Sequence, residues 1–448
     1  MKNILEPMDR ASAGCLNRFP APFPRMRKII LSTLALLLGF TAASDAEGFR
    51  NPPPGAFNLG RAGGRIAHVD DASAATQNPA NLMDLMQPEA QVSPNIVYIS
   101  ADFKSPTGQK AETKDPWKLL PNVFAYLPLE KGKLGAGLAV TTPYGLSVRW
   151  KESSPAFARG GLLRYTSPFT TEMTTINVSP NLAARLADNF QIGVGFDAMW
   201  SKVRFKQYYP WAAFPGSVGT EPDGTADLQA DGWGFGANVG VTWEFLPGHR
   251  LAATWRTPVS LDYEGHMEID NITPTAAAFG ATARSPLQTA ITFPTIIAVG
   301  YGVRLSDRLR VEADVEWLEF SNFKKLQLNA ANNNFLFPST TFPENWDNTF
   351  TAGFGFDWQA TPALILRGGY QFYESPVPDG TLSPAIPDAN QHVFTIGINF
   401  TWKRHAVEAA YGLDLYDDRD ISNSYQPAFN GSYDITVHLL AFAYRYRF

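Results

Sequence analysis

Side chains that perform enzymatic chemistry do not occur in this sequence at a spacing that would let them act together. The histidines show no metal-ligand spacing, and there is no G-x-S-x-G motif of a nucleophilic serine. They are His68, His249, His266, His392, His405 and His438. The single cysteine, Cys15, precedes the part expected in the mature protein, which excludes a cysteine nucleophile there. We therefore predict no enzyme activity, no bound metal and no cofactor.

The side chains that stand out instead are apolar residues in three long connecting segments. Segment 151–170 contains Phe157, Leu162 and Leu163, segment 207–230 contains Tyr208, Tyr209, Trp211 and Phe214, and segment 327–346 contains Phe335, Leu336, Phe337, Phe342 and Trp346. Exposed apolar clusters usually mark binding surfaces. We expect these segments to bind a hydrophobic small molecule; the alternative is that they pack on one another as a lid.

Strands with two-residue alternation must position these segments. Residues 232–245 place Trp233, Phe235 and Trp243 on one face and small or polar residues on the other, and residues 350–359 and 394–402 repeat the pattern. Such strands fit either a soluble sandwich or a barrel with lipid outside. Aromatic residues at both ends of the apolar stripe favour the barrel.

Composition agrees with a barrel that crosses a membrane. Charged residues make up 18% of the 448 residues, compared with roughly 25% in soluble proteins. No run approaches the roughly 20 apolar residues that a spanning helix needs. The net charge of −5 and the lack of a Lys/Arg cluster argue against nucleic acid as a partner.

The sequence divides into about fourteen such strands, an even number that membrane barrels require. They are expected at residues 89–104, 117–129, 133–150, 171–187, 190–206, 231–246, 249–268, 289–305, 308–326, 347–358, 363–373, 391–402, 405–416 and 433–448. Short and long connections alternate between them. This pattern predicts an all-β, transmembrane antiparallel barrel in the outer membrane of a Gram-negative bacterium, with short periplasmic turns and long outer loops.

The first 46 residues have the features of an N-terminal extension followed by a signal peptide. Arg27 and Lys28 precede a short apolar stretch at 29–40, and small residues before Glu47 suit cleavage at that point. Either Met1 or Met26 could be the start. Because Cys15 lies in the part that is removed, the mature protein is expected to contain no cysteine.

The two ends of the mature chain also carry signals. Residues 47–88 are rich in Pro, Gly, Ala and Asn and show no sustained alternation, so we expect them to form a plug, or hatch, inside the barrel of residues 89–448. The last strand ends in Phe448, which is similar to the signal that the outer-membrane insertion machinery reads.

Several short motifs resemble those of one known family. They are Gly48-Phe49, Leu59-Gly60-Arg61-Ala62, Asp71-Ala72-Ser73, Asn78-Pro79-Ala80, Pro143-Tyr144-Gly145-Leu146, Ser375-Pro376-Val377-Pro378 and Ile386-Pro387-Asp388. With them the chain resembles the FadL/TodX family of outer-membrane transporters for hydrophobic compounds. The resemblance implies a monomeric barrel with an N-terminal hatch, which takes up long-chain fatty acids or aromatic hydrocarbons and releases them sideways through a kink in the third strand.

Applied to this sequence, the resemblance implies roles for individual residues. Pro143, Tyr144 and Gly145 would form the lateral opening, since proline lacks a donor for the strand ladder and glycine leaves a gap. Asn78, Pro79 and Ala80 would be the hatch motif, and Phe49 joins the expected ligand-binding residues. Relatives often carry an arginine three residues after the Ile-Pro-Asp motif, where this chain has Gln391.

A fatty-acid ligand would need a cation for its carboxylate, and Lys202 and Arg204 precede one of the aromatic segments. Strict alternation puts them on the face of Phe196 and Trp200, so ligand contact requires a bulge or a position above the membrane. A solvated pair at the rim is the alternative. Glu312, Asp314 and Glu316 alternate along one strand and predict a polar lumen wall, opposite Arg304, Arg310 or Arg367.

The main alternative function is a general diffusion porin for small polar solutes. It predicts polar loops and no plug, whereas this chain has aromatic loops and a plug-like segment. The expected partners are a hydrophobic ligand, outer-membrane lipids and lipopolysaccharide, and the insertion machinery. The sequence does not distinguish fatty acids, alkanes and monoaromatic compounds as cargo.

Overall fold

A computed structural model describes residues 47–330 and 340–448 of the chain. The predicted extension and signal peptide at residues 1–46 lie outside the described residues. So do Phe335, Leu336 and Phe337 of the third aromatic segment. Among the described residues, no helix is long and apolar enough to cross a membrane.

Fourteen antiparallel strands form a closed barrel, as predicted. Five of the fourteen consist of two shorter segments, which are named together in the list below. In chain order they are β1 (Glu89–Val92) with β2 (Asn95–Lys104), β4 (Trp117–Leu120) with β5 (Val123–Glu130), β6 (Leu134–Thr141) with β7 (Gly145–Arg149), β8 (Thr170–Ala187), β9 (Phe190–Tyr209), β10 (Gly224–Leu246), β11 (His249–Arg256) with β12 (Val259–Ile269), β13 (Arg284–Phe293) with β14 (Ile296–Ser306), β15 (Leu309–Leu318), β18 (Thr349–Thr361), β19 (Leu364–Tyr373), β20 (Gln391–Trp402), β21 (His405–Tyr416) and β23 (Gly431–Arg447). The barrel closes where β1 and β2 pair with β23.

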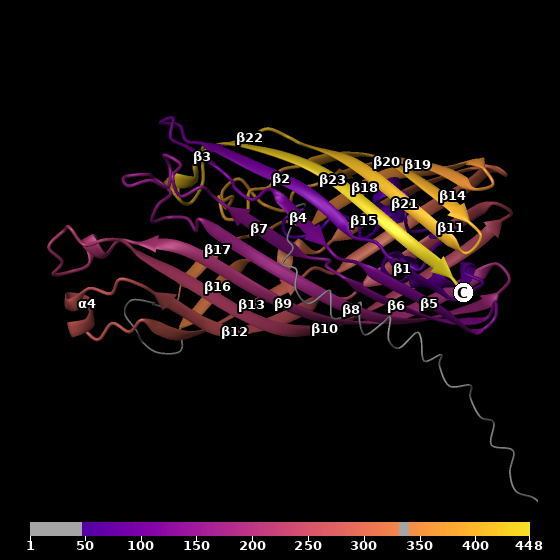
Figure 1. Cartoon of the computed structure of the whole chain (residues 1–448), viewed down its shortest axis with the longest axis horizontal. Helices are drawn as coiled ribbons and strands as arrows, with labels where there is room; N and C mark the ends of the chain where they lie inside the picture. Colours follow the sequence, from indigo (N-terminus) through magenta and orange to yellow (C-terminus); the bar gives the residue numbers. More distant parts are fainter. Residues whose placement is uncertain (1–46, 331–339) are drawn as a thin grey trace, which may run out of the picture. The chain divides into compact units, whose positions relative to one another are not determined.

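Shorter elements lie in the N-terminal segment and the connections. They are α2 (Ala56–Arg61), α3 (Ala74–Gln77), η1 (Pro79–Asp84), β3 (Lys110–Glu112), η2 (Trp211–Ala213), α4 (Pro274–Ala278), η3 (Phe320–Asn322), β16 (Lys325–Ala330), β17 (Thr340–Pro343), β22 (Arg419–Ile421) and η4 (Pro427–Phe429). The connections that carry β3, α4 and β17 lie at one end of the barrel, and the C-terminus lies at the other (Figure 1).

The alternation of side chains follows the prediction. In β18, Phe350 and Phe354 are more than half exposed on the outer surface, while Thr351 between them is fully buried on the inner one. The aromatic side chains therefore face outward, where a membrane barrel contacts lipid.

Five of the predicted continuous strands are interrupted at a proline, and a sixth, predicted at 308–326, stops at Leu318 before η3. The prolines are Pro94, Pro121, Pro143, Pro258 and Pro294. Proline has no N–H for the strand ladder, so the pairing stops there and resumes one to three residues later. The break at residues 142–144 separates β6 from β7, within the third strand.

One predicted loop is shorter than expected. Strand β9 continues through Tyr208 and Tyr209 and pairs with β10, whose first residue Gly224 lies opposite Tyr209. The sequence prediction began β10 at residue 231 and assigned residues 224–230, which include Asp227 and Gln229, to the loop. Polar residues are tolerated there because this end of the hairpin extends toward the outer loops, where no lipid face has to be covered.

Residues 47–88, called here the N-terminal segment, are mostly buried inside the barrel. Helix α2 packs against β18, β19, β20, β21 and β23, whereas η1 packs against β6, β8, β9 and β10. These two groups of strands lie on opposite sides of the barrel. The N-terminal segment therefore crosses the lumen from wall to wall.

Candidate functional site

An aromatic cluster surrounds Phe49, which is 1% exposed. Its ring contacts Tyr144, Phe293, Phe320 and Phe323 edge-on, with centroids 5.5–6.0 Å apart, and stacks on Trp346 at 4.9 Å. Tyr144 in turn stacks on Phe293 at 4.0 Å. These six residues are called the Phe49 cluster. It joins the N-terminal segment to the third strand, to the end of β13 and to the connection after β15.

Hydrogen bonds hold the same part of the N-terminal segment against the break in the third strand. The Asn51 N–H donates to the Pro143 carbonyl at 3.0 Å, and the Gly145 N–H donates to the Phe49 carbonyl at 2.9 Å. The Asn51 side chain donates to the Thr142 carbonyl at 2.8 Å. The predicted opening residues Pro143, Tyr144 and Gly145 are thus brought next to Phe49, and the backbone groups freed by the break have partners, as groups away from water must.

Some of the predicted loop residues extend the Phe49 cluster toward the outer end. Phe157 and Leu163 are fully buried in the same continuous apolar core, and Leu162 and Tyr208 pack against its edge. The Arg164 guanidinium lies 3.8 Å from the centre of the Tyr208 ring. A continuous row of packed apolar side chains, called here the apolar path, therefore connects segment 151–170 with the break in the third strand.

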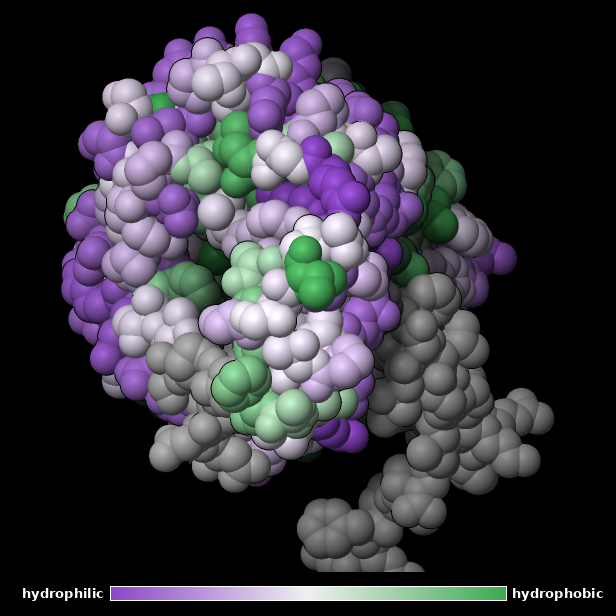
Figure 2. Space-filling model, turned by 90° about the vertical axis from the view of Figure 1, so that its left-hand side faces the viewer, coloured by the Kyte–Doolittle hydropathy of each residue, from purple (hydrophilic) through white to green (hydrophobic). Residues whose placement is uncertain are grey.

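Other predicted loop residues form a separate cluster. Trp211 and Phe214 are buried with Ile269 and Ala276, and Tyr209 packs beside them. These rings face one another instead of the solvent, which is the arrangement expected of a lid. The outer end accordingly shows separate hydrophobic patches within a mainly hydrophilic surface (Figure 2).

The two predicted cations are not brought to either cluster. Lys202 is exposed on the outer face of β9. Arg204 forms an ion pair with Asp227 of β10 at 2.6 Å. Their positions follow the strict strand alternation, and they correspond to the solvated rim pair that the sequence left as the alternative.

Two of the predicted lumen cations, Arg310 and Arg367, do form ion pairs with Asp357 inside the barrel, whereas Arg304 is exposed. Three further cations come from positions that were not predicted. A cavity of about 80 Å³ lies between the N-terminal segment and the break, and Arg50, Arg65 and Arg256 line it together with Tyr144. Each arginine is already paired: Arg50 and Arg65 bind Glu316 at 2.7 and 2.5 Å, and Arg256 binds Asp197 at 2.8 Å.

Buried ion pairs fix the N-terminal segment to β15 and β18. Arg61 binds Glu312 at 2.9 Å and Asp357 at 3.0 Å. Glu312 also accepts hydrogen bonds from the N–H groups of residues 66–68. The predicted polar face of β15 therefore does point inward, but its partners are arginines of the N-terminal segment instead of a solvated wall. Burial lowers the pKa of His68 beside it, so this imidazole is neutral at pH 7.

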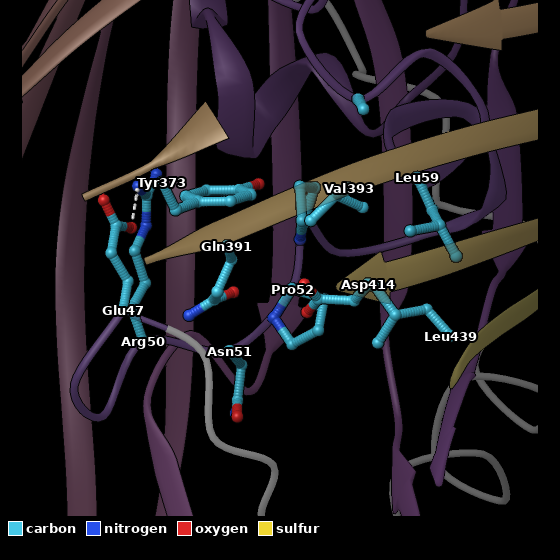
Figure 3. A pocket seen from close by; sticks show the side chains of 12 residues that line it. Glu47, Arg50, Asn51, Pro52, Leu59, Tyr373, Gln391, Val393, Asp414 and Leu439 are labelled. Carbon is cyan, nitrogen blue, oxygen red and sulfur yellow. Dashed lines mark hydrogen bonds and ion pairs between the residues drawn. The ribbon is translucent and has the colours of Figure 1, made fainter. Parts of the chain in front are cut away.

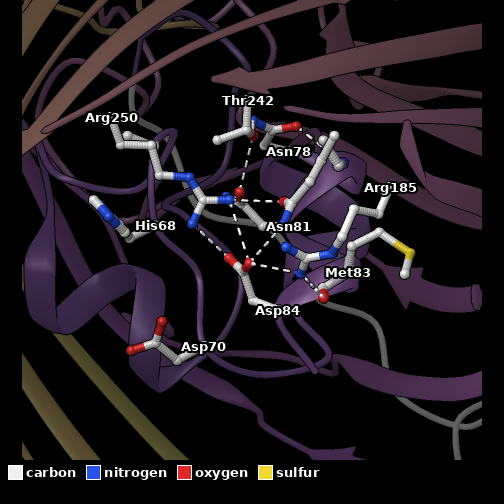
Figure 4. A network of polar contacts seen from close by, with 12 residues as sticks. His68, Asp70, Asn78, Asn81, Met83, Asp84, Arg185, Thr242 and Arg250 are labelled. Atoms are coloured by element: carbon white, nitrogen blue, oxygen red, sulfur yellow. Dashed lines mark hydrogen bonds and ion pairs between the residues drawn. The ribbon is translucent and has the colours of Figure 1, made fainter. Parts of the chain in front are cut away.

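The predicted hatch motif sits against β9 and β10. The Asn78 side chain donates to the Ile66 carbonyl at 2.9 Å and accepts from the Ala80 N–H at 3.1 Å. Any side chain on Gly193 or Gly240 would collide with this turn, so both strands need glycine there. Nearby, Asp84 binds Arg250 at 2.6 Å (Figure 4). The motif thus supports the position of the N-terminal segment.

Sequence reasoning missed Phe293, Phe320 and Phe323 as site residues. Each lies in or beside an expected strand, where an aromatic side chain is the ordinary lipid-facing residue. One signal was available: Phe293 precedes Pro294, and residues 319–323 interrupt the alternation after β15.

Comparison with known proteins agrees with this architecture. Residues 37–448 match the family model described as outer membrane protein transport protein (OMPP1/FadL/TodX). A long-chain fatty acid transport protein of Escherichia coli O6:H1 is 25% identical over 415 residues, which cover 84% of this chain and 89% of the relative. A 47 kDa outer membrane protein of Pasteurella multocida is 27% identical over 392 residues, with 83% and 87% covered.

Solved structures show the same fold. A FadL homologue from Pseudomonas aeruginosa superposes with a TM-score of 0.76 at 20% identity, covering 90% of this chain and all of that structure. The toluene transporter TodX of Pseudomonas putida gives a TM-score of 0.67 at 16% identity, with 90% and 99% covered. The family match over nearly the whole barrel confirms the resemblance and the localisation in the outer membrane: the chain belongs to the OMPP1/FadL/TodX family of outer membrane transport proteins.

Proposed function

We propose that this protein takes up hydrophobic compounds, long-chain fatty acids or related hydrocarbons, passively across the outer membrane. The outer loops capture the compound, and it leaves sideways through the break in the third strand into the membrane. The observation that carries this proposal is the contact of Phe49 with Tyr144 at that break. The names of the relatives, a long-chain fatty acid transport protein and a toluene transporter, support the class of cargo.

The Phe49 cluster suits exchange with an apolar ligand. An aromatic side chain buries roughly 150–250 Å², which at about 25 cal/mol per Å² stabilises the closed state by about 4–6 kcal/mol. A hydrophobic ligand that replaces the Phe49 ring recovers a comparable amount. Since apolar contacts have no fixed direction, the exchange needs no matching geometry.

Passage along the apolar path also suits a hydrophobic cargo. The path from Phe157 and Leu163 to Tyr144 avoids the charged lumen between the N-terminal segment and β15. A compound that leaves through the strand break enters lipid without crossing the aqueous periplasm. No energy source is required when an intracellular enzyme consumes the cargo.

A general diffusion porin fits the contacts less well. The N-terminal segment occupies the lumen from wall to wall and is held by buried ion pairs. We propose that it acts as a hatch. We also expect a monomer that contacts outer-membrane lipids and lipopolysaccharide, and insertion guided by Phe448.

A reversible cross-link tests lateral exit. The variant Asn51→Cys/Thr142→Cys joins the N-terminal segment to the break, where the Asn51 side chain is 2.8 Å from the Thr142 carbonyl oxygen. The expected mature chain contains no other cysteine. Oxidation should lower uptake of radiolabelled oleate or toluene at least tenfold in cells without another transporter, and a reductant should restore it. The two single-cysteine variants are the controls. Parent-rate uptake by fully cross-linked protein would exclude this exit and favour axial release past the hatch.

A further inference from the structure

Two buried carboxylates lie beside the first described residue without a charged partner. Asp388 and Asp414 are 1% and 2% exposed. Among the described residues, no lysine, arginine or histidine forms an ion pair with either side chain. One Asp414 oxygen has no hydrogen-bond partner. Arg419, the nearest candidate, binds Asp379 and backbone carbonyls instead.

Asp388 has polar neighbours and one nearby cation, Arg419, which binds the backbone carbonyl of Asp388 at 3.0 Å and not its carboxylate. Its carboxylate accepts hydrogen bonds from the Gly48 N–H at 3.2 Å and from the Ser375 hydroxyl at 2.7 Å. Burial raises the pKa of Asp388 to about 6. Two buried carboxylates in one site either bind a proton or face a cation, because an uncompensated buried charge is costly.

The backbone nitrogen of Glu47 points into this site. With its amide oxygen turned toward Glu47, the Gln391 side chain accepts from this nitrogen at 2.7 Å and donates to Asp414 at 3.3 Å. Gln391 lies between Glu47 and Asp414 (Figure 3). The next nitrogen, that of Gly48, already contacts Asp388, and consecutive residues are about 3.8 Å apart. The Glu47 nitrogen is therefore one residue away from the nitrogen that contacts Asp388, and the Gln391 side chain bridges it to Asp414.

We infer that cleavage between Ala46 and Glu47 creates an α-ammonium group that is the missing cation of Asp388 and Asp414. Water hydrolyses the peptide bond: its oxygen goes to Ala46, which leaves as a carboxylate, and both of its protons go to the Glu47 nitrogen, which becomes an ammonium group. A free α-amino group ordinarily has a pKa of about 7.7–8.0 and is charged at pH 7. An ammonium has three protons to donate, where the peptide nitrogen has one, so it can serve Gln391 and a carboxylate together.

Cleavage before Glu47 would then also fix the position of the start of the N-terminal segment. The α-ammonium holds Glu47, and Glu47 is two residues before Phe49. Its side chain is 1% exposed and binds Arg50 at 2.8 Å and the Thr351 hydroxyl at 2.6 Å. The start of the N-terminal segment is then fixed over the strand break by an ion pair that exists only after cleavage.

Chemical protection of the amine tests the inference directly and does not involve transport. Sequencing of the purified outer-membrane protein should find Glu47 at the N-terminus. Acetylation by an N-hydroxysuccinimide ester at pH 7, followed by mass analysis of the N-terminal peptide, should be at least tenfold slower in the folded protein than in detergent-denatured protein. A different N-terminus, or equal rates in both states, would overturn the inference.

Variants separate the ion pair from a general effect on folding. One alanine inserted between Ala46 and Glu47 displaces the amine, and acetylation should then approach the denatured rate. Asp414→Asn should lower the midpoint of thermal unfolding in the parent but have little further effect in the insertion variant. Asp418→Asn, which changes an exposed carboxylate just after the end of β21, should leave the midpoint unchanged. Equal losses from Asp414→Asn in both backgrounds would contradict the pairing; if that variant fails to assemble, the acetylation rates decide.

Discussion

The N-terminal segment is held to the barrel by different forces at its two sides. Toward β15 and β18, Arg61 and Arg65 make buried ion pairs with Glu312, Glu316 and Asp357. Toward the third strand, the contacts are the apolar rings of the Phe49 cluster and a few hydrogen bonds to the break.

This difference separates a fixed side from an exchangeable one. A buried ion pair that loses one partner leaves an uncompensated charge, which costs about 3–5 kcal/mol. Ring contacts are non-directional, and another apolar molecule can replace them. In the function proposed above, the N-terminal segment is a hatch that admits a hydrophobic ligand: the charges on one side would keep it in place, and the rings on the other side would be displaced.

We expect the largest effect on the position of the N-terminal segment from a substitution that breaks its buried ion pairs on the fixed side. Glu312→Ala removes the acceptor of Arg61 and of the N–H groups at residues 66–68. We expect it to destabilise the seated N-terminal segment by about 3–5 kcal/mol and to raise single-channel conductance in planar bilayers. Glu130→Ala is the matched control, because its partner Lys133 is exposed and surface pairs contribute little. Unchanged conductance in Glu312→Ala would show that the outer loops close the pore.

We expect the next largest effect, a loss of cargo uptake, from a substitution at the strand break on the exchangeable side. Gly145→Trp fills the break that faces Phe49 and should lower uptake of the cargo at least tenfold without preventing ligand binding. The control is Gly380→Trp, since a side chain at Gly380 meets no neighbour. Heat-modifiable mobility in gels verifies assembly of both variants. Normal uptake by assembled Gly145→Trp would remove the strand break from the transport route.

The sequence predicted the exchangeable side better than the fixed one. The proline and glycine of the break are local signals, and so is the strand alternation that placed Lys202 and Arg204 outward. By contrast, the pairing of Arg61 with Glu312 joins residues 251 positions apart. Inward-facing acidic residues on β15 look the same in sequence whether they face water or an arginine. Only the path of the N-terminal segment across the lumen decides between the two.

A smaller effect is expected from the ring at the centre of the exchangeable side. Phe49→Ala removes its contacts with Tyr144 and Trp346, while the ion pairs of Arg61 and Arg65 remain. The barrel should assemble, and uptake should rise severalfold because opening no longer requires displacement of this ring. Phe49→Leu, which keeps an apolar side chain, should lie near the parent rate. Lower uptake in Phe49→Ala would indicate that Phe49 mainly binds the ligand.

The smallest effect distinguishes the two groups of outer aromatic residues. Tyr208 packs on the edge of the apolar core that reaches the strand break, whereas Trp211 is buried in the separate cluster with Ile269. If the ligand passes from the outer loops along the apolar path, Tyr208→Ser should weaken ligand binding by about two- to fivefold. This factor corresponds to the loss of roughly 0.4–1 kcal/mol from part of the burial of the ring. Trp211→Ser should reduce the thermal stability of the outer loops and leave affinity close to that of the parent, because within residues 47–330 and 340–448 Trp211 packs in a cluster separate from the one that contains Phe49. Titration of a fluorescent fatty acid into the detergent-purified variants measures the difference. A larger loss of affinity in Trp211→Ser than in Tyr208→Ser would move the capture site to the α4 side, and the ring contacts near Phe49 would then serve exit alone.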